Sequence, residues 1–160
     1  MALHKLLVDD FEENSYLLLA IHCTIEDYRL AYLLNKHLKI NLKRNSKDLD
    51  FEYIVSSYSI FEWDDINQDI TWSLVSNICK KEEESLTSSG SLFNASQKIT
   101  RTHNLIPELK KVNYLLKIDT DGRFINGKLI LNKIQEIPQV VAAYTVDVFE
   151  LKSKDNLIFN

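Results

Sequence analysis

Apolar residues follow one another almost without interruption over residues 16–23. Such a run is typical of a strand covered on both faces, because a strand with one face in water alternates apolar and polar side chains. Beyond it, apolar residues recur every three or four positions, as one face of a helix requires. The pattern therefore predicts a central strand over 16–23 and a helix over about 25–38, with Thr24 as its N-cap.

Two later stretches alternate with a period of two and are rich in aromatic and β-branched residues. They cover residues 53–63 and 70–79, and Asp64, Asp65 and Asn67 between them are common turn residues. The alternation and the short connection predict an antiparallel hairpin.

The C-terminal third shows a strand pattern over 112–119, followed by the turn signal Asp121-Gly122. Isoleucines at helical spacing then predict a second helix that ends before Pro138, because proline lacks an amide donor and disfavours helical geometry in the residue before it. Alternation over 140–149 predicts a last strand.

The order of these elements predicts an α+β fold. It favours a two-layer arrangement, loosely ferredoxin-like, in which two principal helices cover one face of a mainly antiparallel sheet. Residues 82–100 lose the periodicity and combine charges, serines and Gly90, so they are expected to form a mobile loop. A chain of 160 residues with 45% hydrophobic side chains is expected to form one domain over 1–160.

Composition narrows the classes of function. The net charge is −4, which makes binding to nucleic acid through the phosphate backbone unlikely. Only 3 glycines and 2 prolines occur, and no glycine-rich phosphate loop is present. No apolar run approaches the roughly 20 residues of a membrane span, and Cys23 and Cys79 lie far apart in apolar stretches, as buried free thiols do. We therefore expect a cytoplasmic protein without a membrane segment.

Ligands for a metal are sparse. The densest group in the first half is His22, Cys23, Glu26 and Asp27. His22 and Cys23 point to opposite faces of a strand, and zinc needs three or four such groups around one point. We therefore predict no metal site and no cofactor.

A candidate for acid–base chemistry lies just before the strand over 112–119. Arg101, His103 and Glu108 are close in sequence, and a histidine paired with a carboxylate can transfer protons. No nucleophile pattern accompanies them, so their catalytic roles remain unassigned.

The segment Ile106-Pro107-Glu108-Leu109-Lys110-Lys111-Val112-Asn113-Tyr114 resembles the motif of the uncharacterised bacterial IPExxxVDY family. Five of the six defining residues are present, and Asn113 stands where the motif has aspartate. An amide cannot act as a base, so a catalytic role for this position is not expected. The resemblance implies a bacterial protein but no activity, cofactor or partner.

The same segment has a physical interpretation. Pro107 fixes its own backbone and keeps Ile106 extended, and Val112 and Tyr114 are expected to enter the sheet on one face. Glu108 is expected to cap backbone amides or to pair with an arginine, Arg101 or Arg123. The segment can therefore be interpreted either as a structural junction or as a binding site. The candidate binding residues are Arg101, His103, Glu108, Asn113 and Tyr114.

The leading hypothesis is a noncatalytic module that binds a protein partner or a small ligand, with a homodimer through a sheet edge as one option. The alternative is a small enzyme that uses Glu108 and His103 in acid–base chemistry. A nucleic-acid accessory role for the basic stretch over 36–47 ranks third.

Overall fold

A computed structural model describes residues 16–51, 56–85 and 97–159. Its helices and strands occur in the following order: β1 Tyr16–His22, α2 Asp27–Leu38, β2 Lys43–Arg44, β3 Leu49–Phe51, β4 Ser56–Tyr58, β5 Ile60–Asp65, β6 Ile70–Ser76, β7 Ile78–Ser85, β8 Gln97–Asn104, β9 Tyr114–Asp119, α3 Gly127–Gln135 and β10 Ala142–Thr145. Three short 3-10 helices complete the described part: η1 Pro107–Leu109, η2 Val148–Glu150 and η3 Lys154–Leu157.

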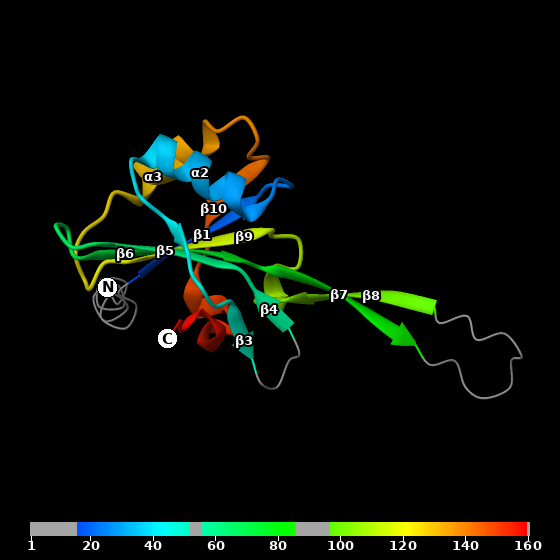
Figure 1. Cartoon of the computed structure of the whole chain (residues 1–160). Helices are drawn as coiled ribbons and strands as arrows, with labels where there is room; N and C mark the ends of the chain where they lie inside the picture. The colour runs from blue at the N-terminus through cyan, green and yellow to red at the C-terminus, as the bar shows by residue number, and fades with distance from the viewer. Residues whose placement is uncertain (1–15, 52–55, 86–96, 160) are drawn as a thin grey trace, which may run out of the picture.

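The main sheet has six strands in the order β10-β1-β9-β6-β5-β2, and every neighbouring pair is antiparallel (Figure 1). Within it, β10, β1, β9 and β6 have the order of a ferredoxin-like sheet, since β9 and β10 flank β1 and are connected through α3. Strands β5 and β2 extend this sheet on one side. The predicted α+β class with a mainly antiparallel sheet is confirmed.

The helices α2 and α3 lie together over one face of the sheet (Figure 1). Leu30 and Leu34 of α2 and Ile134 of α3 pack with Leu19 and Ile21 of β1 in one apolar cluster. Helix α2 ends where the spacing predicts but begins at Asp27, and its N-cap is Glu26 rather than Thr24. The Asp27 carboxylate accepts a hydrogen bond from the Tyr28 backbone amide, so it satisfies a donor of the first turn.

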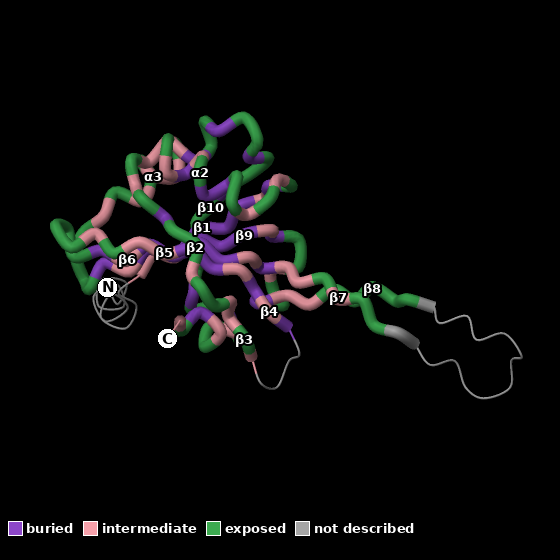
Figure 2. The backbone as a smooth tube through the Cα atoms, in the orientation of Figure 1, coloured by how far each residue is buried: buried purple, intermediate pink, exposed green. Residues whose placement is uncertain are grey.

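The opposite face of the sheet is also covered, which explains why Leu18 and Ala20 of β1 are buried beside Leu19 and Ile21 (Figure 2). The cover consists of β4, the residues on either side of η1 and the C-terminal segment, which contribute Tyr58, Ile106, Val112, Val148, Leu151 and Leu157 to a second apolar cluster. The sequence predicts the buried run of β1, but it does not predict this second cover.

Lys117 of β9 holds the C-terminal segment against this second face. Its ammonium group donates to the Leu157 carbonyl at 3.0 Å and lies over the rings of Tyr16 and Phe159, 4.7 and 5.1 Å from their centroids. Burial lowers the pKa of Lys117 from its ordinary value, against the opposing effect of Asp119. A single charged side chain thus connects the middle of the sheet to residues near the C-terminus.

The predicted hairpin is present as β5 and β6, in which Trp63 pairs with Trp72. The strand predicted over 53–63 is, however, divided. Ser56–Tyr58 forms β4, which pairs with β3 in a separate sheet, and residues 53–55 lie outside the described part. The strand predicted over 140–149 is also shorter, since β10 ends at Thr145 and η2 begins at Val148, where the Asp147 carboxylate accepts from the Phe149 amide.

The largest difference concerns residues 82–100, for which the sequence predicts a loop. Strand β7 continues to Ser85 and β8 begins at Gln97, and the two form a hairpin arm that projects from the body of the molecule (Figure 1). Ion pairs join the strands diagonally, Glu82 with Lys98 and Glu83 with Arg101, so charges that interrupt the apolar periodicity here form contacts between the two strands. Residues 86–96 lie outside the described part, and the expectation of mobility is untested.

No helix in the described ranges is long and apolar enough to span a membrane.

Candidate functional site

Asn77, in the link between β6 and β7, holds the segment that resembles the family motif. Its side chain is fully buried. The amide nitrogen donates to the carbonyls of Leu109 and Val112 at 2.8 and 2.9 Å, and the amide oxygen accepts from the Ile106 backbone at 2.8 Å. One side chain therefore satisfies three backbone groups of the turn that contains η1.

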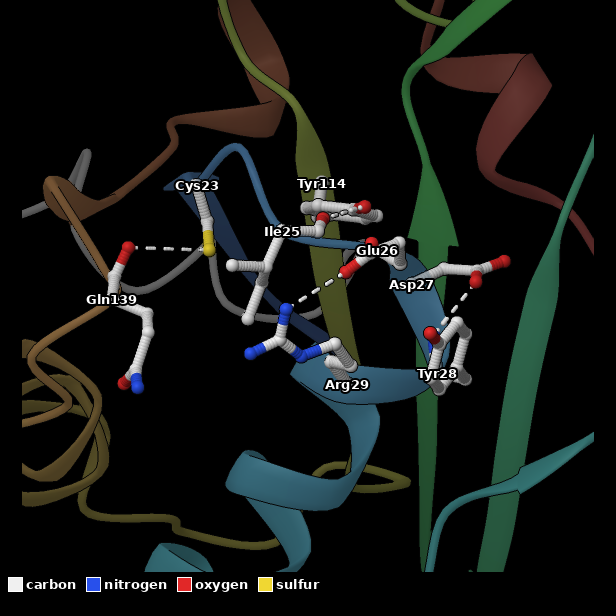
Figure 3. Close-up of polar contacts among 8 residues, drawn as sticks. All are labelled: Cys23, Ile25, Glu26, Asp27, Tyr28, Arg29, Tyr114 and Gln139. Carbon is white, nitrogen blue, oxygen red and sulfur yellow. Dashed lines mark hydrogen bonds and ion pairs between the residues drawn. The ribbon is translucent and has the colours of Figure 1, made fainter.

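Asn113 and Tyr114, at the end of that segment, form hydrogen bonds with the backbone that links β1 to α2. The Asn113 side-chain oxygen accepts from the Cys23 backbone amide at 2.9 Å. The Tyr114 hydroxyl donates to the Ile25 carbonyl at 2.6 Å, as Figure 3 shows. Position 113 thus needs an acceptor, which an amide supplies as well as a carboxylate does. Its observed role requires no charge.

The surroundings of Tyr114 change its acidity. Burial, with a smaller effect from the nearby Asp27, Cys23 and Glu26, raises the pKa of the Tyr114 hydroxyl to about 12. The pKa of Glu26 is lowered because its carboxylate accepts from its own backbone amide and from Arg29. Tyr114 is therefore a neutral hydrogen-bond donor at physiological pH, and its geometry is that of a structural contact.

Glu108 lies in η1 and contacts the C-terminal segment. Its carboxylate accepts from the backbone amide and the hydroxyl of Ser153, at 3.1 and 3.0 Å. The expectation that Glu108 caps a backbone amide is confirmed, whereas the expected arginine pairing is wrong, because Arg101 pairs with Glu83 and Arg123 with Asp69. The carboxylate links η1 to the residue before η3.

Arg101 and His103 lie on β8, away from these contacts. Arg101 is exposed in the arm, and His103 is paired with Cys79 near its base. No hydrogen bond or ion pair joins His103 to Glu108 within the described part of the chain. The five candidate residues therefore do not form one site, and the acid–base hypothesis lacks the contact that it requires.

The motif segment also contributes to both faces of the sheet. Val112 packs in the cluster under the C-terminal cover, whereas Tyr114 packs in the cluster under the helices. The expectation that both lie on one face is wrong, because the ladder of β9 begins only at Tyr114 and the Val112 backbone belongs to the preceding turn.

A shallow groove of about 460 Å³ lies beside the motif segment. Its lining is formed by η1 and the turn after it together with one side chain of β10, namely Pro107, Glu108, Leu109, Lys110, Lys111, Val112 and Tyr144. The Tyr144 hydroxyl lies 3.3 Å from His22 Nε2, and the two rings are 5.6 Å apart. His22 therefore contacts the Tyr144 side chain, which lines the groove and belongs to the edge strand β10.

That edge is β10, and part of its backbone faces outward. Val146 donates to the Leu18 carbonyl, so in this antiparallel register Tyr144 and Val146 face β1, whereas Ala143 and Thr145 face away from it. The Gln135 side-chain amide donates a hydrogen bond to the Ala143 carbonyl at 2.9 Å. The amides of Ala143 and Thr145 have no hydrogen-bond partner among the described residues.

Other groups offer less chemistry. Cys23 is buried and donates to the Gln139 carbonyl at 3.3 Å (Figure 3). Within the described ranges, no three His, Cys, Asp or Glu side chains are grouped so that they could hold a metal ion. In a cavity of about 660 Å³ near β2 and β3, Arg44 forms an ion pair with Asp48, and the Glu62 carboxylate accepts a hydrogen bond from Asn45.

Comparison of the chain with protein-family models, curated proteins and solved structures returned no match.

The sequence draws attention to the motif but not to Asn77 or Tyr144. The available signal for Asn77 is an amide within a predicted strand that is rich in apolar residues, since a buried amide must find several partners. Tyr144 carries no such signal, because its role depends on an edge position that only the sheet order reveals.

Glu108→Ala is expected to lower the free energy of unfolding by about 1 kcal/mol, because the contacts with Ser153 are charge-assisted but lie at the surface. Glu108→Gln should cost less, since the amide retains an acceptor. Urea denaturation measures both, with Glu150→Ala at an exposed position of η2 as the matched control. A loss no greater than that of the control would contradict the structural role.

Proposed function

We propose that this protein is a noncatalytic module that binds an extended segment of a protein partner at the open edge of β10. The observation that supports it best is the combination of the exposed, outward backbone amide of Thr145 on β10 with the adjacent groove. An added strand gains affinity from main-chain hydrogen bonds and specificity from pockets that receive alternate side chains. Both elements are present side by side here.

The sequence of the edge favours this proposal. Residues 139–146 carry no charge, and Val141 has 79% of its surface exposed. Protein edges usually carry lysines or other features that prevent strand addition. The opposite edge of the sheet follows this rule, because β2 consists of the exposed Lys43 and Arg44. The uncharged edge is therefore the one suited to accept a strand.

The groove adds a preference of charge. Lys110 and Lys111 are exposed on its wall, and the Glu108 carboxylate already accepts two hydrogen bonds from Ser153. We infer that the bound segment places an acidic side chain near these lysines and an apolar side chain against Tyr144. The motif segment then serves binding through its shape, while its own polar groups maintain the turn.

We favour binding over catalysis because the polar side chains of the motif are already bound to backbone groups of the same chain. We also propose the cytoplasm as the compartment, since Cys23 and Cys79 are both free thiols. The bacterial origin rests on the family resemblance alone and is part of the same proposal.

Panning a phage-displayed library of random peptides against the purified protein tests the function. We expect enriched peptides that contain an acidic residue and that bind Thr145→Pro at least about tenfold more weakly than the wild type. Proline removes the outward amide of Thr145, and the bonds between β10 and β1 are made by other residues. Thr145→Val is the matched control, because it changes the side chain and retains the amide.

Two results would contradict the proposal. One is the absence of enriched peptides, and the other is equal binding of the selected peptides to the proline variant. Exchanging both Lys110 and Lys111 for glutamate should remove the preference for acidic residues without unfolding the protein, since both side chains are exposed.

A further inference from the structure

The arm formed by β7 and β8 presents a second open edge. The two strands form a sheet of their own, and among the described residues the arm contacts the body chiefly through β4 and η1 at its base. Beyond the base, the described side chains are largely exposed (Figure 2). A two-stranded hairpin in water is marginally stable, and its edges are free to pair with another strand.

The register of the arm determines which residues face outward. Leu105 donates to the Asn77 carbonyl, and the pairing continues in the same register from Ile78 with Asn104 onwards. In an antiparallel ladder the bonded pairs alternate, so the odd-numbered residues of β7 bond to β8. The backbone groups that point away from β8 are therefore those of Lys80, Glu82 and Glu84.

The outer edge of β7 carries a charge pattern that is complementary to itself. Its sequence reads Lys80-Lys81-Glu82-Glu83-Glu84. If two copies pair antiparallel about a two-fold axis at Glu82, each outward residue meets an outward residue. This register places Lys81 opposite Glu83 of the second copy, and Lys80 opposite Glu84 of the second copy. Four of the five opposed positions then combine a lysine with a glutamate.

The repulsion between the two Glu82 carboxylates at the central position is weak. Glu82 meets Glu82 of the second copy, but each is already paired with Lys98 of its own chain at 3.7 Å. The other edge of the arm lacks such a pattern, because pairing β8 with itself about Thr100 places Ile99 opposite Arg101. Pairing β2 with itself would bring the exposed Lys43 and Arg44 of both copies together.

From this charge complementarity we propose that a second copy of this chain pairs with the outer edge of β7. The two arms form one four-stranded antiparallel sheet, with β7 of each copy at its centre. Main-chain hydrogen bonds connect the copies, and the exposed lysine–glutamate contacts determine register and orientation. Because these contacts lie in water, added salt weakens the dimer. This surface is separate from the β10 edge.

Exchanging the charges of one opposed pair tests the proposal by sedimentation equilibrium over a range of concentrations. The wild type should change from one chain of 18.6 kDa to twice that mass, at lower concentration in low salt. Lys81→Glu and Glu83→Lys should each dimerise about tenfold more weakly, because two attractive contacts per dimer become repulsive. An equimolar mixture of the two variants should regain the affinity, since the mixed dimer contains only opposite charges at these positions.

Lys128→Glu, at an exposed position of α3, is the matched control and should dimerise as the wild type does. Circular dichroism verifies that each variant is folded. A wild type that stays monomeric at all concentrations would overturn the proposal. So would a dimer that persists in both single variants, or a mixture that does not regain affinity. Peptide binding at β10 is measured separately and does not depend on these outcomes.

Discussion

Asn77→Ala is expected to lower the free energy of unfolding by roughly 3 kcal/mol or more, because the side chain bonds three backbone groups. The substitution leaves the Ile106 amide and the Val112 carbonyl without the Asn77 side chain as partner, whereas the Leu109 carbonyl still accepts from the Val112 amide. A buried polar group that loses its hydrogen bond costs about 1–3 kcal/mol. Urea denaturation at neutral pH measures the difference.

Two further variants separate this role from the loss of volume. Asn77→Asp has nearly the same size and still accepts from Ile106, but it cannot donate to the two carbonyls and would place a charge in a buried position. It should destabilise the protein at least as much as alanine does. Asn104→Ala also removes an amide that donates to a backbone carbonyl, but at a half-buried position, so a loss of about 1 kcal/mol is expected. Equal losses for Asn77→Ala and Asn104→Ala would contradict the proposed importance of Asn77.

The parts of the fold that the sequence predicts are those determined by local apolar periodicity. Strand β1 and helix α2 are examples, because the buried residues Leu18 to Ile21 and the stripe of Leu30 and Leu34 are visible in the chain itself. Their partners on the sheet need not be known. The same reasoning finds the β5–β6 hairpin, whose strands are joined by a short turn.

The arm shows where this reasoning fails. Its strands are polar on both faces, so neither strand has an apolar pattern. Their pairing becomes recognisable only in the folded chain, where Glu83 contacts Arg101 and Glu82 contacts Lys98 diagonally across the ladder, from a segment more than ten residues away. A charged run without apolar periodicity can therefore still form a strand, because its carboxylates reach cations on the facing strand through diagonal contacts.

The candidate site was predictable in part. The motif makes Asn113 and Tyr114 candidate residues, but the partners that they contact, Cys23 and Ile25, lie about ninety residues earlier. No local pattern encodes that contact. Glu108 likewise bonds Ser153, 45 residues later, rather than a nearby arginine. Sequence reasoning identifies side chains that need partners, and the sheet order determines which partners they meet.

Tyr114→Phe is expected to lower the free energy of unfolding by about 1–2 kcal/mol at neutral pH, because the Ile25 carbonyl loses a donor at 2.6 Å. The difference should depend on pH. In the folded protein the pKa of Tyr114 is raised to about 12, above the ordinary value of 10.0, chiefly by burial. The folded state thus favours the neutral phenol, and this contribution is fully present below pH 10 and is lost as pH rises toward 12.

The stability of the wild type should therefore decrease by roughly 2 kcal/mol more than that of Tyr114→Phe between pH 9 and pH 12, so the difference between the two proteins narrows and disappears. Tyr16, whose pKa is also raised, is present in both proteins and does not affect the comparison. Urea denaturation at several pH values gives the two curves. Tyr32→Phe, at an exposed position of α2, should leave stability within about 0.5 kcal/mol of the wild type at neutral pH. Parallel curves for wild type and Tyr114→Phe up to pH 12 would show that the hydroxyl of Tyr114 is not buried in the contact described here.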